Sequence, residues 1–262
     1  MEFEKIYCIA DNSSYNACKT LESITEKYSA IIDEHNYDLV VVLGGDGFML
    51  HSMHKYMHTG VPLYGINCGN IGFLMNRWSN KDLLENISKS KLTKLSTLST
   101  TVHSVDGSVH NVFAINELSL FRQIYQTANI CITVNHRVKI DKLVSDGVLL
   151  ATPAGSGAYN SSVGGPILPI CSNLLSLMPI SPFRPRGWKG ALLPDDVTVK
   201  FDVVHPAKRP VSAVADFAEF RNVCRVEVKK STENAISLLF SPEQMLEDRI
   251  INEQFSLSCT LN

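Results

Sequence analysis

The sequence predicts an α/β domain with a parallel sheet, followed by a β-rich domain and a short C-terminal segment. Before about Leu98, short apolar runs alternate with stretches of helical pattern, the order that builds a parallel sheet covered by helices. After Leu98, apolar and polar residues alternate in short segments separated by turns, as in antiparallel strands. Pro242–Phe255 returns to a helical pattern, so we expect a C-terminal helix that packs back on the first domain. We therefore divide the chain into residues 1–98, 99–240 and 241–262.

The first domain opens with a short apolar strand at Lys5–Ala10. Asp11–Ser14 supplies capping side chains, which predict a helix over Tyr15–Tyr28. The apolar, β-branched run Asp38–Leu43 is typical of a strand buried on both faces of a parallel sheet. The elements expected after it are a helix over Phe48–Thr59, a strand over Val61–Asn67 and a helix over Asn80–Lys89.

The second domain is expected to consist mainly of strands, because its apolar residues recur with a period of two. The strands predicted in this way are Val112–Phe121, Ile130–Val134, Val197–Val204, Val211–Phe217 and Val223–Lys229.

Composition excludes several classes of protein. The chain has 262 residues and a net charge of −2, so no overall basic field attracts nucleic acid or acidic lipid. No apolar stretch approaches the roughly 20 residues needed to span a bilayer, and Met1–Lys5 does not resemble a signal peptide. Seven cysteines are scattered without a CxxC pair, which predicts neither a zinc site nor a disulfide framework. We expect a protein of a reducing compartment, the cytoplasm.

The run "VVVLGGDGFML", Val40–Leu50, places three glycines and one carboxylate at the end of a buried strand. A tight turn alone would account for Gly and Asp, since both are common turn formers. The alternative is a loop whose backbone N–H groups face an anionic ligand, with Asp46 placed to act on it.

Two other features are better explained by structure than by chemistry. His51, His54 and His58 share one helix face, but no Cys, Asp or Glu nearby completes a metal-ligand set, so a solvated or interface face is favoured and no metal site is predicted. Ser156 lies in Ala154-Gly155-Ser156-Gly157, which does not satisfy the GxSxG nucleophile pattern. The usual P-loop and GxGxxG fingerprints are absent as well.

Further glycine-rich loops follow other predicted strands. "GINCGNIGFL" spans Gly65–Leu74, and "SDGVLLATPAGSGAYNSSVGGP" spans Ser145–Pro166. Between them, Asn116 and Glu117 interrupt the apolar segment "VFAINELSLF", where a polar pair is unfavourable unless each group finds a partner. Turn chemistry would explain any one of these loops. Three glycine-rich loops and a polar pair within an apolar segment, all in one chain, indicate a functional site.

On these residues the chain resembles the NAD kinases. The GGDG loop of that family is Gly44–Gly47, its GxNxGxLGFL stretch is Gly65–Leu74 with Ile71 in place of Leu, its Asn-Glu motif is Asn116-Glu117, and its DG…TPTGSTAY…GGP block is Asp146–Pro166. The four motifs stand in family order. Besides Ile71, the chain departs from the family pattern at three positions, which are Ala154 and Gly157, where the family has threonines, and Phe217, which replaces the glycine after Asp216.

The resemblance implies a Rossmann-like N-terminal domain, a β-sandwich-like C-terminal domain with the site between them, and a homo-oligomer, often a tetramer. It implies transfer of the ATP γ-phosphoryl group, with Mg²⁺, to the 2′-hydroxyl of the adenosine ribose of NAD, giving NADP. Asp46 would act as general base, and Asp146 would reach the nicotinamide end of NAD bound to a neighbouring subunit. The predicted NAD-binding residues are Asp46, Gly47, Phe73, Asn116, Glu117, Asp146, Ala154, Gly157, Ala158, Tyr159, Ser162 and Asp216, and the predicted phosphate-binding residues are Gly44, Gly45, Gly47, Gly69 and Asn70.

Two alternatives remain open from the sequence. GGDG also occurs in lipid kinases, but Asn116-Glu117 and the Asp146–Pro166 block would then be coincidental. A dinucleotide sensor without catalytic activity would fit the two replaced threonines, although the intact Asp46 argues against it.

Overall fold

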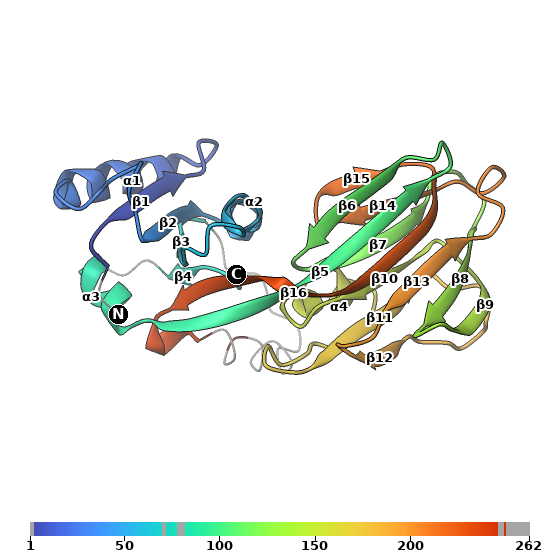
Figure 1. Ribbon diagram of the computed structural model, residues 1–262. Helices are drawn as coiled ribbons and strands as arrows, with labels where there is room; N and C mark the ends of the chain where they lie inside the picture. The colour runs from blue at the N-terminus through green and yellow to red at the C-terminus, as the bar shows by residue number, and fades with distance from the viewer. Residues whose placement is uncertain (1–2, 70–71, 78–81, 246–248, 250–262) are drawn as a thin grey trace. The chain divides into compact units, whose positions relative to one another are not determined.

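The computed structural model describes residues 3–69, 72–77, 82–245 and 249 (Figure 1). It divides into a first unit, Met1–Leu95 with Asn234–Asn262, and a second unit, Ser96–Glu233. The chain passes between the units in two long strands that pair with each other, β5 (Lys91–Ser104) and β16 (Val223–Phe240). The boundaries expected at 98 and 240 both fall within these strands, where composition gives no sharp signal.

The first unit is built on parallel strands in the order β1-β2-β3, with β4 beside β3 and the end of β16 paired to β3. Every residue of β2 is buried, as expected for a central parallel strand covered on both faces. Side chains of α1 and α3 pack with those of the strands in one apolar cluster, which includes Ile24, Ile87 and Val41. The elements are β1 (Ile6–Ala10), α1 (Tyr15–Tyr28), β2 (Leu39–Gly44), α2 (Asp46–Tyr56), β3 (Leu63–Asn67), β4 (Asn76–Arg77), α3 (Leu83–Lys89) and the short 3-10 helix η2 (Pro242–Gln244).

The carboxyl ends of β1, β2 and β3 meet at one edge of this sheet. The N–H of Asp11 donates to the carbonyl of Leu43 at 2.9 Å, and the N–H of Cys68 donates to that of Gly44 at 2.9 Å. Helix α2 begins at Asp46, earlier than the predicted Phe48, because an acidic residue in the first helical turn is stabilised by the helix dipole. Asp46 therefore lies directly at the strand-to-helix junction.

The second unit contains two sheets packed face to face. One has the order β12-β11-β10-β7-β14-β15 and is antiparallel throughout. The other contains β5, β6, the first part of β16, β13, β8 and β9. The remaining elements are β6 (Val109–Ala114), β7 (Glu117–Arg122), β8 (Ala128–Val134), β9 (Arg137–Ser145), β10 (Gly147–Ala151), η1 (Ala154–Gly157), α4 (Tyr159–Ser162), β11 (Leu174–Ile180), β12 (Ala191–Pro194), β13 (Val199–Val203), β14 (Val211–Ala215) and β15 (Ala218–Phe220).

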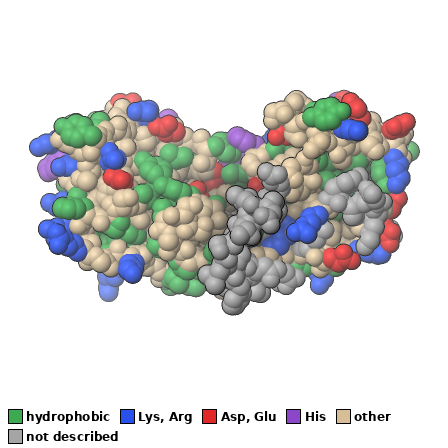
Figure 2. Space-filling view, turned by 180° about the vertical axis from the view of Figure 1, so that it is seen from behind, with side chains coloured by type: hydrophobic (Ala, Val, Ile, Leu, Met, Phe, Trp, Pro, Cys, Tyr) green, Lys and Arg blue, Asp and Glu red, His purple; other side chains and the backbone are tan. Residues whose placement is uncertain are grey.

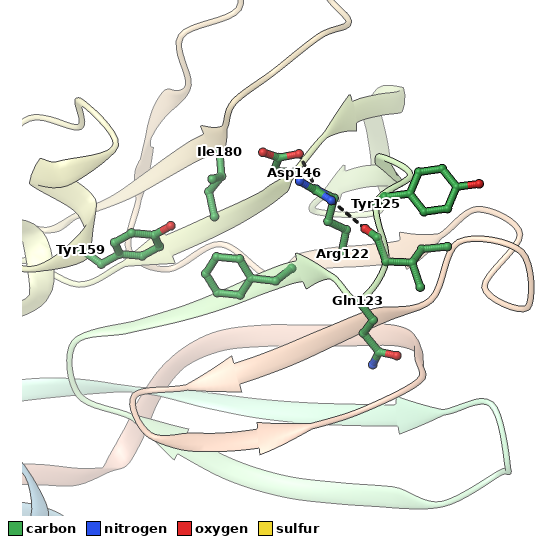
Figure 3. Close-up of a pocket in the computed structure, with 8 residues that line it drawn as sticks. Arg122, Gln123, Tyr125, Asp146, Tyr159 and Ile180 are labelled. Carbon is green, nitrogen blue, oxygen red and sulfur yellow. Dashed lines mark hydrogen bonds and ion pairs between the residues drawn. The ribbon is translucent and has the colours of Figure 1, made fainter.

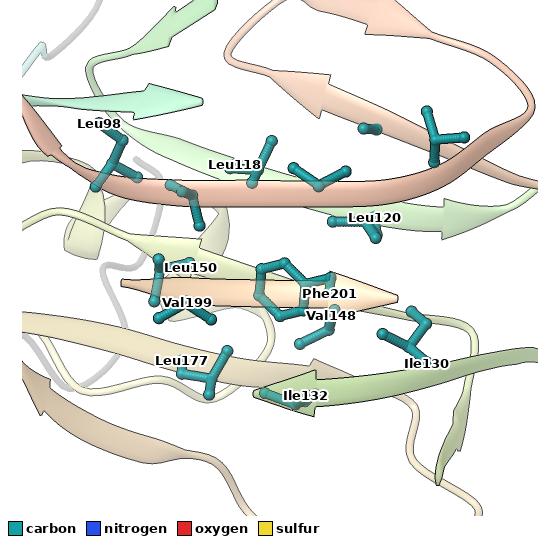
Figure 4. Close-up of a cluster of buried hydrophobic side chains, with 14 of the residues drawn as sticks. Leu98, Leu118, Leu120, Ile130, Ile132, Val148, Leu150, Leu177, Val199 and Phe201 are labelled. Atoms are coloured by element: carbon teal, nitrogen blue, oxygen red, sulfur yellow. The ribbon is translucent and has the colours of Figure 1, made fainter. Parts of the chain in front are cut away.

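Alternate residues of the facing strands form the core of the second unit (Figure 4). Leu118 and Leu120 of β7 belong to it, as do Ile130 and Ile132 of β8 and the fully buried Phe201 of β13. This spacing of two residues is the period expected where one face of a strand is buried. The predicted α/β domain and sandwich domain are both confirmed.

The structure differs from the prediction between β6 and β7. The strand predicted over Val112–Phe121 is wrong as a single element, since β6 and β7 are separated at Ile115 and Asn116. The predicted C-terminal helix Pro242–Phe255 and the segment 241–262 lie mostly outside the described residues, apart from η2 and Arg249.

The described part of the chain contains no helix long and apolar enough to cross a membrane. On the visible face of the molecule, basic and acidic side chains are interspersed (Figure 2), in keeping with the small net charge of −2.

Candidate active site

The carboxylate of Asp46 is held by the turn Gly72–Met75, which follows β3 in the chain. Its Oδ2 accepts a hydrogen bond from the N–H of Phe73 at 2.6 Å, and its Oδ1 accepts one from the N–H of Leu74 at 3.0 Å. A carboxylate has about four acceptor positions, so two bonds fix its orientation and leave capacity for a ligand hydroxyl. Asp46 is half-buried and stands at the sheet edge where ligands of open α/β sheets bind.

Gly72 permits this close approach. A Cβ at that position would lie 2.6 Å from Oδ1 of Asp46, closer than real Cβ atoms come to other atoms, and 3.1 Å from its Cγ. Any larger residue in place of the glycine of the GxNxGxLGFL stretch would therefore displace the Asp46 carboxylate.

The other predicted residues of the first unit lie along the same sheet edge. Gly44 ends β2, Gly45 precedes α2 and Gly47 is exposed in its first turn. The N–H of Gly69 donates to Oδ1 of Asn67 at 3.0 Å, and Phe73 is half-buried. The predicted phosphate-binding residue Asn70 lies outside the described residues, as does Ile71.

In the second unit, Asp216 creates the break in which Asn116 and Glu117 stand. Its Oδ2 accepts from the N–H of Ile115 at 2.7 Å, while its Oδ1 accepts from Asn116 at 2.9 Å and from Glu117 at 3.2 Å. These three N–H groups are bound to a side chain, so β6 ends at Ala114 and β7 begins at Glu117. Asp216 has a φ of +52°, which Asp tolerates better than most residues. The predicted NAD ligand Asp216 thus has its carboxylate on the protein backbone.

The segment Thr152–Tyr159 packs against this break. The N–H of Thr152 donates to the carbonyl of Asn116 at 2.9 Å, and its hydroxyl donates to the carbonyl of Ile115 at 2.7 Å. A Cβ on Gly155 would lie 2.2 Å from the carbonyl oxygen of Asn116, so only glycine fits there. The Asn-Glu motif and the glycine-rich block, far apart in the sequence, therefore meet.

The carboxyl group of Glu117 holds its proton more tightly than an exposed glutamate does. Burial, together with the neighbouring charge of Asp216, raises its pKa to about 7. Its buried Oε2 has no hydrogen-bond partner among the described residues. The pKa of Tyr159 is also raised, by burial and by the charges of Glu117 and Asp146. A buried carboxylate oxygen without a partner is a site ready to bind a polar ligand group.

Asp146 and Tyr159 line an open pocket of about 510 Å³ in the second unit (Figure 3). Oδ1 of Asp146 accepts from Nε of Arg122 at 2.6 Å, and Arg122 also donates to the carbonyl of Ile124 at 2.7 Å. The pocket combines aromatic and aliphatic walls with this ion pair. Its lining residues are Phe121, Arg122, Gln123, Ile124, Tyr125, Asp146, Tyr159 and Ile180.

Sequence reasoning did not identify Arg122, because a charged residue after an apolar strand carries no signal without knowledge of the strand opposite it. The pairing of β7 with β10 supplies that knowledge: the N–H of Arg122 donates to the carbonyl of Asp146 at 2.9 Å.

The other predicted residues of the glycine-rich block occupy its short helices. Ala154 and Gly157 lie in η1, Ala158 links it to α4, and the exposed Ser162 ends α4. Ser156, which the sequence did not favour as a nucleophile, is fully buried, and its hydroxyl donates to the carbonyl of Pro153 at 2.7 Å. Within the described ranges, no group of three His, Cys, Asp or Glu side chains is placed to hold a metal ion.

Both units match known family models. Residues 1–95 match the ATP-NAD kinase N-terminal domain, and residues 115–214 match the ATP-NAD kinase C-terminal domain. The NAD kinase of Rickettsia bellii (strain OSU 85-389) is 46% identical over 255 residues, covering 97% of this chain and 99% of that protein. The NAD kinase of Rickettsia typhi (strain ATCC VR-144 / Wilmington) is 48% identical over 239 residues, covering 87% of this chain and 94% of that protein.

Two solved structures share the fold at 20% sequence identity. Yeast NADH kinase complexed with NADH has a TM-score of 0.83 and covers 100% of this chain and 91% of its own. An NAD kinase from Archaeoglobus fulgidus in complex with ATP has a TM-score of 0.78 and covers 97% of this chain and 100% of its own. Fold, motifs and relatives together define a nucleotide-dependent phosphotransferase. The chain belongs to the ATP-NAD kinase family.

Proposed function

We propose that this chain phosphorylates NAD to NADP, transferring the γ-phosphoryl group of ATP to the 2′-hydroxyl of the adenosine ribose. The observation that carries the proposal is the Asp46 carboxylate, held by two backbone N–H groups at the carboxyl end of β2. Phosphoryl transfer asks a protein mainly for positioning and charge neutralisation, and a positioned carboxylate can also take the proton of the attacking hydroxyl. In this proposal Asp46 is the general base.

Glu117 and Asn116 recognise the NAD molecule in this proposal. A buried carboxyl with a free Oε2 suits a ribose hydroxyl, which can both donate and accept a hydrogen bond. Tyr159 and the pocket beside Asp146 offer an aromatic and a charged wall to the other half of the dinucleotide. Because residues 115–214 match the C-terminal domain of ATP-NAD kinases, the lipid-kinase alternative has no comparable support.

Magnesium enters this proposal as part of the substrate MgATP. Mg²⁺ is usually held by one or two carboxylates together with substrate phosphates, and it keeps several waters. It would neutralise charge on the phosphates during transfer.

We also propose that the enzyme is a homo-oligomer of the cytoplasm, in which Asp146 serves the NAD of a neighbouring subunit. In support, Tyr125 lines the Asp146 pocket and is 86% exposed, which leaves an aromatic surface beside that pocket for a neighbouring subunit to cover. All six described cysteines carry free thiols, as is usual in a reducing compartment.

The direct test is incubation of the protein with MgATP and NAD, with NADP detected by an NADP-specific dehydrogenase. NADP formation that depends on both substrates supports the proposal. Binding of NAD without NADP formation would indicate the sensor, and labelling of diacylglycerol instead of NAD by γ-labelled ATP would indicate the lipid kinase.

A further inference from the structure

The guanidinium of Arg249 is bound to the turn that holds Asp46. Its Nη1 donates to the carbonyl oxygens of Gly72 at 3.2 Å and Phe73 at 2.9 Å, and also to that of Met75. The guanidinium carbon lies 5.7 Å from the centroid of the Phe240 ring, so the charge is partly enclosed by an aromatic face. A half-buried cation is unfavourable unless it is well bonded, and the three carbonyls provide those bonds.

Two peptide groups connect Arg249 to Asp46 directly. The carbonyl of Gly72 and the N–H of Phe73 belong to one peptide group, and the carbonyl of Phe73 and the N–H of Leu74 belong to the next. In each, the oxygen accepts from Arg249 while the N–H donates to Asp46. In a trans peptide, C=O and N–H point in opposite directions, so the two peptides form parallel bridges between a cation and an anion.

In each of these peptide groups, the hydrogen bond to Arg249 and the hydrogen bond to Asp46 strengthen each other. A cation at the carbonyl oxygen polarises the peptide and makes its N–H a better donor, and an anion at the N–H has the converse effect on the oxygen. The pKa of Arg249 is lowered by burial, while the charge of Asp46 opposes that shift. The guanidinium nevertheless stays protonated at any physiological pH.

We propose that Arg249 is a positioning residue for the reaction: it orients the two peptide groups that fix the Asp46 carboxylate. The inference rests on the proposed role of Asp46 as general base. It assigns a part in catalysis to the C-terminal segment, which the glycine-rich motifs do not include.

The hydrogen bonds that Arg249 makes determine which substitutions test its role. The three bonds to the turn come from Nη1, so a lysine ammonium with three donors can replace them in part, whereas a methionine cannot. Arg225 supplies the control, because its Nε donates to Asp202 at 2.6 Å on the surface of the second unit. The set is therefore Arg249→Met, Arg249→Lys and Arg225→Met in the full-length protein.

The first measurement is amide hydrogen exchange at Phe73 and Leu74, which reads the geometry without relying on activity. Exchange should speed up at least about tenfold in Arg249→Met and much less in Arg249→Lys. Unchanged protection at both amides in a folded Arg249→Met protein would overturn the inference. This result stands whether or not the wild-type protein makes NADP, so it separates failure of this inference from failure of the proposed function.

The second measurement is steady-state kinetics. A misplaced reacting group can lower turnover by roughly 10²-fold, so Arg249→Met should lose kcat by 10- to about 100-fold with the KM for NAD nearly unchanged. Arg249→Lys should recover most of the loss, and Arg225→Met should match wild type. In an Asp46→Asn background, Arg249→Met should have little further effect, because both changes act through one group. A raised KM with normal kcat, or fully additive losses, would overturn the inference.

Discussion

Oδ1 of Asp216 accepts a hydrogen bond at 2.9 Å from the backbone N–H of Asn116, a residue 100 positions earlier in the chain. The same carboxylate binds the N–H groups of Ile115 and Glu117. Because these three donors are turned toward Asp216, the chain leaves the strand ladder for two residues. The polar pair Asn116-Glu117 therefore stands at the open end of β7 instead of within a continuous strand.

Substituting Asp216 should disturb NAD recognition without touching NAD itself. Asp216→Asn keeps the size of the side chain, but it replaces one carboxylate oxygen with an amide NH2 group. That NH2 group would face a backbone N–H, so two donors would meet. Unmet buried N–H groups cost about 1–3 kcal/mol, so we expect both a lower Tm and a KM for NAD raised by roughly tenfold. The KM for ATP should change little.

The matched comparison is Asn116→Ala, which removes a side chain proposed to bind NAD and leaves the backbone bonds in place. It should raise the KM for NAD with little loss of Tm. If Asp216→Asn kept its Tm and still lost NAD binding, Asp216 would be a direct ligand, as the family resemblance implies.

The raised pKa of Glu117, about 7, makes stability depend on pH. The unfolded chain has the ordinary value of 4.5, so the folded state binds more protons between these two values. The stability contributed by the protonated form is complete below the unfolded pKa and is lost as pH rises through 7.

Glu117→Gln cannot ionise and should escape that loss. Its stability relative to wild type should rise by about 2 kcal/mol between about pH 5 and about pH 8.5, measured by urea unfolding of both proteins. A difference that stays constant across this range would show that Glu117 titrates normally in the folded protein.

A site shared between subunits predicts complementation. Asp46→Asn and Asp146→Asn should each be nearly inactive alone. In a mixed oligomer with random pairing, about a quarter of the sites would take both native carboxylates from different chains, so activity should return. Tagged co-purification establishes that mixed oligomers have formed.

Mixed oligomers as inactive as their components would show that each site is built from a single chain. Asp146 would then need a role other than contact with a neighbour's NAD; if that role is its ion pair with Arg122, Arg122→Gln should reproduce the effect of Asp146→Asn.

The local sequence pattern predicted much of this fold, because helix caps and apolar runs are set by residues close together in the chain. The capping serine before Tyr15 and the buried run ending at Gly44 each carry their own signal, and α1 spans the predicted Tyr15–Tyr28. The motif residues were visible as glycines and polar groups in apolar surroundings. Local pattern could not reveal the break at Asn116, because the bond that makes it comes from Asp216. It could not reveal Arg249 either, since a single arginine in a helical pattern carries no sign of the turn it binds.

The kcat of Asp46→Asn, measured with saturating MgATP and NAD alongside the Kd for NAD, tests the proposed mechanism most directly. Asparagine keeps the shape of the side chain but cannot take the proton of the 2′-hydroxyl. We expect kcat to fall by roughly 10²–10⁴-fold while the Kd for NAD changes little. Near-normal turnover in a variant that binds NAD normally would contradict the role of Asp46 as the general base.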